Sequence, residues 1–206
     1  ILEPLSEEII HYIFGENEKL PEIKFIKDIN DIENMPEFDI VIGNPPFQQV
    51  EKGKRKAQFV NLWSKFIKLS EDSTKHGGLI VLITPSSWMS GSKDLNYPTS
   101  IIKDFFAKYQ TVFLDLTINK FFKVGSTFCY FIVKKEEKHS SSEIKVSEKE
   151  SFNLDLSKYD KLPNNLSRLT ISILEKIQNY NGEFIPMERF DKFGNGISSS
   201  KEENEK

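Results

Sequence analysis

Hydrophobic residues along this chain recur at two spacings, and each spacing predicts a different kind of element. Short apolar runs and alternating patterns are typical of strands and occur at 22–29, 38–42, 79–83, 112–116 and 127–133. Apolar residues three or four positions apart are typical of helices and occur at 6–14, 58–69, 98–106 and 166–180. Strands and helices therefore alternate along most of the chain. This order predicts an α/β fold with a doubly wound, mostly parallel sheet covered by helices.

The last two predicted strands and the residues after them depart from this alternation. Only a short link separates 112–116 from 127–133, so we expect these strands to form a terminal antiparallel hairpin. Residues 135–150 are rich in charge and serine, which indicates a solvated excursion or linker. The chain then divides into a first domain at 1–134 and a second region at 151–206, whose polar end is typical of a disordered tail.

Composition supports a folded domain and limits its class. The 206 residues are 38% hydrophobic and 29% charged, which is the balance of a globular protein. The formal net charge of −3 excludes binding to nucleic acid through bulk positive charge, although it is compatible with a local basic patch. Cys129 is the only cysteine, and neither a membrane-length apolar run nor a signal-like start is present, which indicates a cytoplasmic protein. The chain begins at Ile1 instead of Met, so we expect a fragment of a longer protein.

The most informative cluster follows the predicted strand at 38–42. Its members are Asn44, Pro45, Pro46 and Phe47. In an open α/β sheet, ligands bind beyond the carboxyl ends of the strands, which is where these residues come. The prolines carry no N–H donor, so their carbonyls and the Asn44 amide oxygen suit an amino group with two hydrogens, and Phe47 offers a ring for base stacking. Two acceptors that bind one amino group favour methyl transfer to its nitrogen. The alternative interpretation is that these residues form an ordinary turn.

The whole segment 38–47 resembles the catalytic motif of S-adenosylmethionine-dependent, adenine-specific DNA methyltransferases, particularly those of bacterial restriction-modification systems. Two later segments, 77–89 and 122–128, are similar to further parts of the same family. The resemblance covers 1–134. It implies a Rossmann-like methyltransferase fold, incomplete at the N-terminus, with a partial catalytic domain in this range. The region 151–206 would then begin a target-recognition region.

The resemblance implies a catalytic role for the four residues after the strand. Asn44 and Pro45 would accept hydrogen bonds from the amino group of the target adenine. Pro46 fixes the backbone beside them, and Phe47 would stack on the base after it is flipped out of the duplex. Direct methyl transfer needs no metal and no covalent intermediate, which agrees with a sequence that shows no metal-ligand spacing of His or Cys.

The resemblance also implies a cofactor site. By order and spacing, Glu3 and Asp28 would contact the ribose and adenine of S-adenosylmethionine, with Asn44 beside the cofactor. The alternatives are a charge at a helix start for Glu3 and a strand-end cap for Asp28. The family's glycine-rich first motif would precede Glu3 and is not part of this chain, so we expect an N-terminal segment or a partner subunit to supply it.

A basic stretch follows the cluster and comprises Lys52, Lys54, Arg55 and Lys56. These side chains would contact phosphates of double-stranded DNA next to the extruded nucleotide, and the alternative is a solvated loop. Ser86 and Trp88 follow the next predicted strand and could line the same pocket, although a tryptophan is more often part of the core. Other functions stay open: methylation of RNA bases or of protein glutamine, and a non-catalytic role as a DNA-binding or subunit fragment.

Overall fold

The computed structural model describes residues 36–50, 59–91, 94, 96–122, 125–137 and 141–182. By its internal contacts the chain divides into two units, 1–171 and 172–206, and the first contains every strand that the structure describes. The strand predicted at 22–29 and the helix predicted at 6–14 lie outside the described residues, as does the predicted polar tail. No helix in the described ranges is both long enough and apolar enough to cross a membrane.

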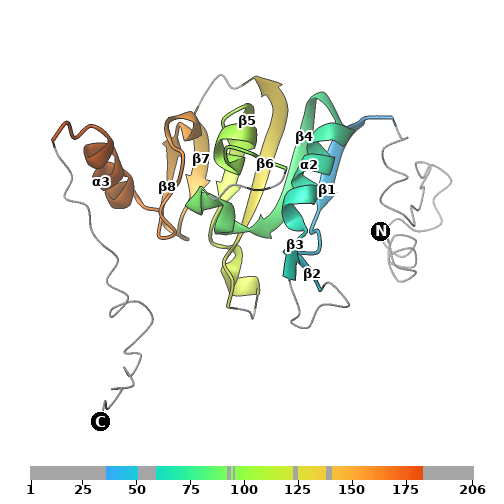
Figure 1. The fold of residues 1–206 in the computed structure, drawn as a ribbon, viewed down its shortest axis with the longest axis horizontal. Helices are drawn as coiled ribbons and strands as arrows, with labels where there is room; N and C mark the ends of the chain where they lie inside the picture. The colour runs from blue at the N-terminus through green and yellow to red at the C-terminus, as the bar shows by residue number, and fades with distance from the viewer. Residues whose placement is uncertain are drawn as a thin grey trace, which may run out of the picture. The chain divides into compact units, whose positions relative to one another are not determined.

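The first unit is built on a six-stranded sheet in the order β1-β4-β6-β5-β7-β8 (Figure 1). In chain order its strands are β1 (Phe38–Gly43), β4 (Thr74–Pro85), β5 (Tyr109–Asp115), β6 (Phe128–Glu137), β7 (Ser142–Lys145) and β8 (Ser151–Leu154). β1 runs parallel to β4, and β5 runs parallel to β7, whereas the other neighbouring pairs are antiparallel. The α/β prediction is confirmed, but the described sheet is mixed and not mostly parallel.

The sheet is mixed because the predicted hairpin lies inside it. β5 and β6 form an antiparallel pair, but β6 returns between β4 and β5, and β5 then pairs with β7. The hairpin is therefore not terminal. β7 falls within the predicted linker 135–150, where Ser142 and Ile144 are fully buried between charged or exposed neighbours. Buried and more exposed residues alternate along this segment, which is the pattern of a strand. Ser142–Lys145 therefore belongs to the sheet and not to a solvated linker.

Helices and single turns lie between the strands and after the last one. They are α2 (Trp63–Ser73), α3 (Arg168–Gln178), the 3₁₀ turns η2 (Ser86–Ser90), η4 (Ile118–Phe121) and η5 (Leu156–Lys158), and the π-helical turn η3 (Ile102–Phe106). A second sheet pairs β2 (Gln48–Val50) with β3 (Phe59–Asn61) and comes between β1 and α2 in the chain. The helix predicted at 58–69 is wrong at its start, because Phe59–Asn61 pairs as a strand and α2 begins at Trp63.

Aromatic rings of η3 and β6 form the centre of the core. Phe105, Phe106 and Phe131 are fully buried and meet edge to face. The inward face that the sequence predicts for 98–106 is confirmed by this burial, although the helical part is only a short π turn. Asp104 anchors the turn, because its carboxylate accepts hydrogen bonds from the backbone N–H groups that precede η3.

Two consecutive glycines, Gly77 and Gly78, lie inside β4. β4 begins upstream of them at Thr74, and Gly77 has a φ of 77°, in the left-handed region that favours glycine. The pairing of β4 with β1 is irregular at this place. Gly78 packs against backbone, since a Cβ on it would lie 2.8 Å from the carbonyl oxygen of Asp39 and 2.7 Å from Cγ2 of Thr74. The close approach of the two parallel strands therefore depends on Gly78.

Gly78→Ala is expected to lower the free energy of unfolding by about 1–3 kcal/mol, because the added methyl group overpacks the β1–β4 contact. Gly125→Ala is the matched control, since a Cβ at Gly125 would meet nothing within 4 Å, and its effect should stay within about 0.5 kcal/mol. Urea unfolding of the chain measures both. Equal stability of the two variants would contradict the tight packing at Gly78.

Candidate active site

The four residues after β1 lie at the edge of the sheet where two parallel strands end. β1 ends at Gly43 and β4 ends at Pro85, and their parallel pairing brings both carboxyl ends to this edge. In the cluster, Asn44 is exposed, Pro45 is buried and Pro46 is exposed. The asparagine side chain is therefore accessible to a ligand at the place where the sequence predicts a pocket.

The backbone around the cluster is held from both sides. The N–H of Leu62, which directly precedes α2, donates to the carbonyl of Phe47 at 3.0 Å. Gly43 lies so close to β4 that a Cβ on it would be 3.3 Å from Cδ2 of Leu82. Between these two anchors the proline rings fix their own φ angles. The backbone that carries Asn44 consequently has little freedom to change its direction.

A pocket of about 670 Å³ opens beside the cluster. Asn44, Pro45 and Pro46 form part of its wall together with β1, including Ile42, whose residue surface is 75% exposed. On the α2 side it is lined by Phe66, Leu69, Ser70 and Ser73. The volume is in the range of small-molecule sites, and the wall is mostly apolar with a few polar groups. This arrangement can bind a flat, partly apolar ligand whose polar atoms reach Asn44.

Phe47 lies against an aromatic residue from far along the chain. Its ring centroid is 4.7 Å from that of Phe128, with the planes tilted by 43°. Phe128 begins β6 and pairs with Pro85 of β4, so it lies at the same edge as the cluster. Phe122 stacks on Phe128 with centroids 4.5 Å apart. The sequence analysis gave Phe128 no role, because its contact with Phe47 depends on strand register. The sequence showed only that an aromatic residue stands near the start of an apolar strand.

Ser86 and Trp88 come directly after β4 but take structural positions. The Ser86 hydroxyl donates to Oγ1 of Thr127 at 2.7 Å, which ties the end of β4 to the start of β6. Trp88 is buried and stacks on Phe106 with centroids 4.3 Å apart. Neither residue lines the pocket beside Asn44. The interpretation of Trp88 as a core residue is the one that the structure supports.

The single cysteine is also structural. Cys129 is fully buried in β6, and its sulfur accepts a hydrogen bond from the indole N–H of Trp88 at 3.4 Å. Burial raises the pKa of the Cys129 thiol to about 11, although hydrogen bonds with Thr84 and Trp88 act in the opposite direction. The thiol is therefore protonated at neutral pH and is not available as a nucleophile.

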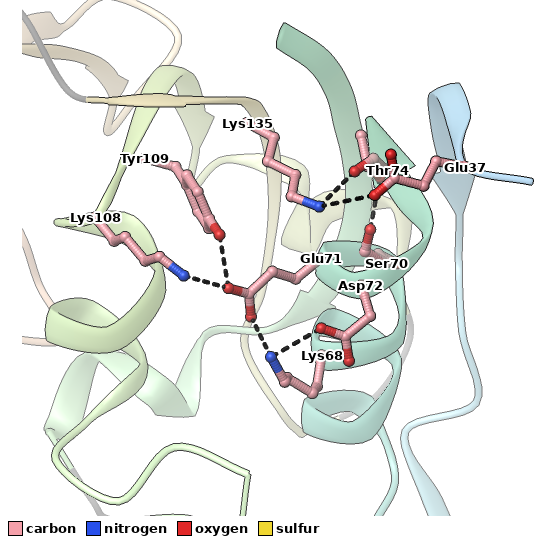
Figure 2. Close-up of polar contacts among 9 residues, drawn as sticks. All are labelled: Glu37, Lys68, Ser70, Glu71, Asp72, Thr74, Lys108, Tyr109 and Lys135. Atoms are coloured by element: carbon pink, nitrogen blue, oxygen red, sulfur yellow. Dashed lines mark hydrogen bonds and ion pairs between the residues drawn. The ribbon is translucent and has the colours of Figure 1, made fainter. Parts of the chain in front are cut away.

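A charged cluster lies at the opposite edge, where β4 and β5 begin (Figure 2). Its centre is Glu71 of α2, whose side chain is 6% exposed. This carboxylate accepts hydrogen bonds from Lys108 Nζ and Tyr109 Oη at 2.8 Å each. Lys68 Nζ donates to its other oxygen at 3.1 Å. The buried carboxylate is thus fully satisfied by its neighbours.

Further contacts at this edge join β1, β4 and β6 (Figure 2). The ammonium group of Lys135 in β6 donates to the Thr74 carbonyl at the start of β4 and lies 3.8 Å from a carboxylate oxygen of Glu37, just before β1. The Thr74 hydroxyl donates to the carbonyl of Ser70 in α2 at 2.6 Å. These contacts hold the amino ends of two parallel strands, at the end of the sheet opposite Asn44, and Ser70 also lines the pocket.

The charged cluster has the electrostatics of a structural element. Burial alone would raise the pKa of Glu71, but the hydrogen bonds from Lys108, Tyr109 and Lys68 outweigh it and lower this pKa below its usual value of 4.5. The hydrogen bond to Glu71 in turn raises the pKa of Lys108. Both groups therefore stay charged at neutral pH. A carboxylate with a lowered pKa is a poor general base, so we assign Glu71 to stability.

Several predicted site residues lie outside the part of the chain that the structure describes. They are Glu3, Asp28, Lys52, Lys54, Arg55 and Lys56. The first two were predicted to bind cofactor, and the basic four were predicted to bind DNA. These roles stay predictions. The described residues bring together Asn44, Pro45, Pro46 and Phe47 and add Phe128 to them.

The chain belongs to the Eco57I restriction-modification methylase family, whose model matches residues 3–113, more than half of its length. The match includes the pocket cluster, α2 and β4. The predicted membership of a restriction-modification methyltransferase family is thereby confirmed. Comparison with curated proteins gives no match.

Solved structures similar to this chain are longer proteins. The M protein of the type I restriction enzyme EcoKI is 21% identical, with a TM-score of 0.40 over 55% of this chain and 25% of that chain. A structure of type I R-M system assembly is 12% identical, with a TM-score of 0.43 over 71% and 31% of the two chains. A Listeria monocytogenes protein described as a class I S-adenosylmethionine-dependent methyltransferase is 15% identical, with a TM-score of 0.39 over 70% and 43%. The chain spans less than half the length of each.

Glu71→Gln is expected to lower the free energy of unfolding at pH 7 by about 2 kcal/mol, because the amide keeps the shape but loses the charge that its three donors stabilise. The folded state lowers the pKa of Glu71 below 4.5, so its stabilisation is present above that pH and is lost as the pH falls through the folded value. The difference between the two proteins should therefore shrink below pH 4.5. Urea unfolding at pH 7, 5, 4 and 3 measures it.

Asp72→Asn is the matched control for this prediction. Asp72 also pairs with Lys68, at 2.9 Å, but its side chain is 58% exposed. Its replacement should cost less than about 1 kcal/mol at pH 7. A Glu71→Gln effect that is no larger than this, or that is constant with pH, would show that the buried carboxylate does not act through its charge.

Proposed function

We propose that this protein transfers a methyl group from S-adenosylmethionine to the exocyclic amino group of adenine in DNA, within a restriction-modification system. The observation that carries the proposal is that an exposed Asn44 and two prolines at the carboxyl end of β1 line a pocket and that Phe47 follows them directly. Membership of a restriction-modification methylase family supports it. The choice of adenine over other targets rests on the chemistry of these four residues.

The cluster offers acceptors without competing donors. The Asn44 amide oxygen and the Pro45 carbonyl can each accept one hydrogen of an amino group, and Pro46 has no N–H that could compete for the same lone pairs. An amine held in this way keeps its nitrogen lone pair directed away from the acceptors. Because adenine conjugation normally draws that lone pair into the ring, such positioning makes the nitrogen a better nucleophile.

Phe47 would hold the base that carries this amine. The target amino group lies inside a DNA duplex, so the nucleotide must leave the stack before Asn44 can reach it. An aromatic ring replaces part of the lost stacking, with about 1–3 kcal/mol per base. The partly buried Phe47 ring follows Pro46 directly and so lies next to the acceptors. The hydrogen-bond acceptors Asn44 and Pro45 and the stacking ring of Phe47 are thus parts of one short segment.

The described residues fit the reacting end of the cofactor. When bound, S-adenosylmethionine supplies a methyl group on a positively charged sulfur. The pocket of about 670 Å³ is large enough for a small molecule, and its mostly apolar wall beside Asn44 would contact the apolar parts of the cofactor. Glu3 and Asp28 would hold the ribose and the adenine of the cofactor. A preceding segment or a partner subunit would add the glycine-rich part of the site.

The proposed partner is double-stranded DNA. Residues 51–58 join β2 to β3, and β2 follows Phe47 directly, so the basic stretch is attached beside the pocket cluster. Lys52, Lys54, Arg55 and Lys56 would there contact phosphates, which fixes register without reading sequence. The stretch is thus a local concentration of positive charge in a chain whose net charge is negative.

Asn44→Ala tests the proposal most directly. Loss of one acceptor should lower methyl transfer from labelled S-adenosylmethionine to adenine in DNA by about 100-fold or more, with the fold unchanged. Asp72→Asn is the control, because Asp72 is exposed, does not line the pocket and should not affect transfer. Calorimetric titration with the cofactor separates a loss of binding from a loss of catalysis. Full activity of Asn44→Ala would refute its role, and label found in RNA or in glutamine would refute the substrate.

Phe47→Ala is expected to weaken binding of an adenine-containing single-stranded oligonucleotide by about 5- to 150-fold, which corresponds to the loss of about 1–3 kcal/mol of stacking. An unpaired strand removes the cost of base flipping from the measurement. The same oligonucleotide with an abasic site in place of adenine serves as the control, and its affinity should not change. Equal weakening for both ligands would mean that Phe47 supports the loop and not the base. Fluorescence anisotropy measures all four affinities.

A further inference from the structure

We infer that Phe128 is a positioning residue for Phe47: its ring, fixed at the start of β6, holds the Phe47 ring in the orientation in which a base stacks on it. The inference rests on the proposed function of Phe47 as a stacking platform. It adds to that function a residue that acts through Phe47 and not by touching substrate or cofactor. Three features carry it: the freedom of the Phe47 ring, the rigidity of Phe128 and the contacts of the turn η4.

Phe47 has a fixed backbone but needs a support for its side chain. Its carbonyl is held by the N–H of Leu62, and the preceding Pro46 has a fixed φ angle of its own. The ring itself is only partly buried and can take any of the staggered χ1 positions that its surroundings leave open. Phe128 lies within ring contact, with centroids 4.7 Å apart and planes at 43°. At this distance the Phe128 ring sterically blocks part of the χ1 rotation of Phe47.

Phe128 is rigid enough to act as the support. Its residue surface is 3% exposed, and its backbone pairs in register with Pro85 at the end of β4. Its N–H donates to Oδ1 of Asn119. The preceding Thr127 is fixed to Ser86 by a side-chain and a backbone hydrogen bond. The start of β6 is therefore held by both β4 and the loop that precedes it.

Asn119 extends this support to η4. Its side-chain oxygen accepts from Phe128, and its backbone carbonyl accepts from the N–H of Phe122 at 3.0 Å. Phe122 also stacks on Phe128 with centroids 4.5 Å apart and planes at 28°. Phe128 is the ring that contacts both of the others. A change at Asn119 should therefore reach Phe47 through Phe128, although every aromatic ring is still present.

Fluorine NMR of the full chain tests the inference without any ligand. Phe47→Trp, labelled with 5-fluorotryptophan, gives three signals, because the native chain contains only Trp63 and Trp88. Adding Phe128→Leu should shift and broaden the signal of residue 47, and the buried Trp63 should serve as an unchanged reference. Phe113→Leu is the matched control, because its ring pairs with Tyr130, and it should leave residue 47 unaffected.

Asn119→Ala provides a second variant that keeps all rings in place. It should move the fluorine signal of residue 47 in the same direction as Phe128→Leu does. If Phe128→Leu does not fold, the signal of Asn119→Ala tests the inference on its own. Thermal unfolding establishes that each variant is native at the temperature of the spectra. A signal of residue 47 that is the same in Phe128→Leu, Asn119→Ala and the parent overturns the inference.

Binding separates this inference from the proposed function. In the chain with native Phe47, Phe128→Leu should weaken binding of the adenine oligonucleotide by about 2- to 12-fold, the equivalent of one aromatic pair, and leave binding of the abasic oligonucleotide unchanged. Equal affinities of Phe128→Leu and the native chain for the adenine oligonucleotide overturn the positioning role. If the native chain itself does not distinguish adenine from an abasic site, the proposed function fails, and the fluorine signal still decides whether Phe128 orients residue 47.

Discussion

The pairing of β4 with β1 on one side and β6 on the other is the constraint on which the candidate site depends. Parallel pairing sets Gly43 opposite Leu82, and antiparallel pairing sets Phe128 opposite Pro85. The loop after β1, the end of β4 and the start of β6 thereby share one edge of the sheet. A shift of one residue in either register would turn the side chains of that strand to the other face. The alternating burial along β4, with Ile80 fully buried, opposes such a shift.

Charge and chemistry are separated along the same strands. The carboxylate of Glu71 and its three donors lie at the amino ends, whereas no charged residue lines the pocket beside Asn44 among those that the structure describes. The uncharged lining leaves no neighbouring charged side chain among the described residues to compete with the Asn44 amide and the Pro45 carbonyl for a bound amine. The ionic contacts of Glu71 are therefore made by side chains outside the pocket lining, although α2 also contributes Ser70 and Ser73 to that lining.

Local pattern was enough to predict the strands that carry the site. The apolar run before Gly43 and the chemistry of Asn44 and the prolines are contiguous in the sequence, so local spacing alone identifies the cluster. The start of α2 was less predictable, since the apolar residues 59 and 60 fit both the strand and the helix spacing. β7 was missed because its two buried residues stand among charged ones, and only pairing with β5 reveals them as a strand. Contacts between segments far apart in the chain, such as Phe47 with Phe128, depend on how the strands pair. The spacing of residues within one segment cannot predict them.

The buried sulfur next to Phe128 has a practical consequence. Cys129 is inaccessible and its thiol is protonated at neutral pH, so an alkylating reagent can reach it only in molecules in which the packing around the start of β6 has opened. This cysteine lies one residue from the ring that contacts Phe47. Its rate of modification therefore reports how often the start of β6 becomes exposed, in the unaltered protein and without any added label.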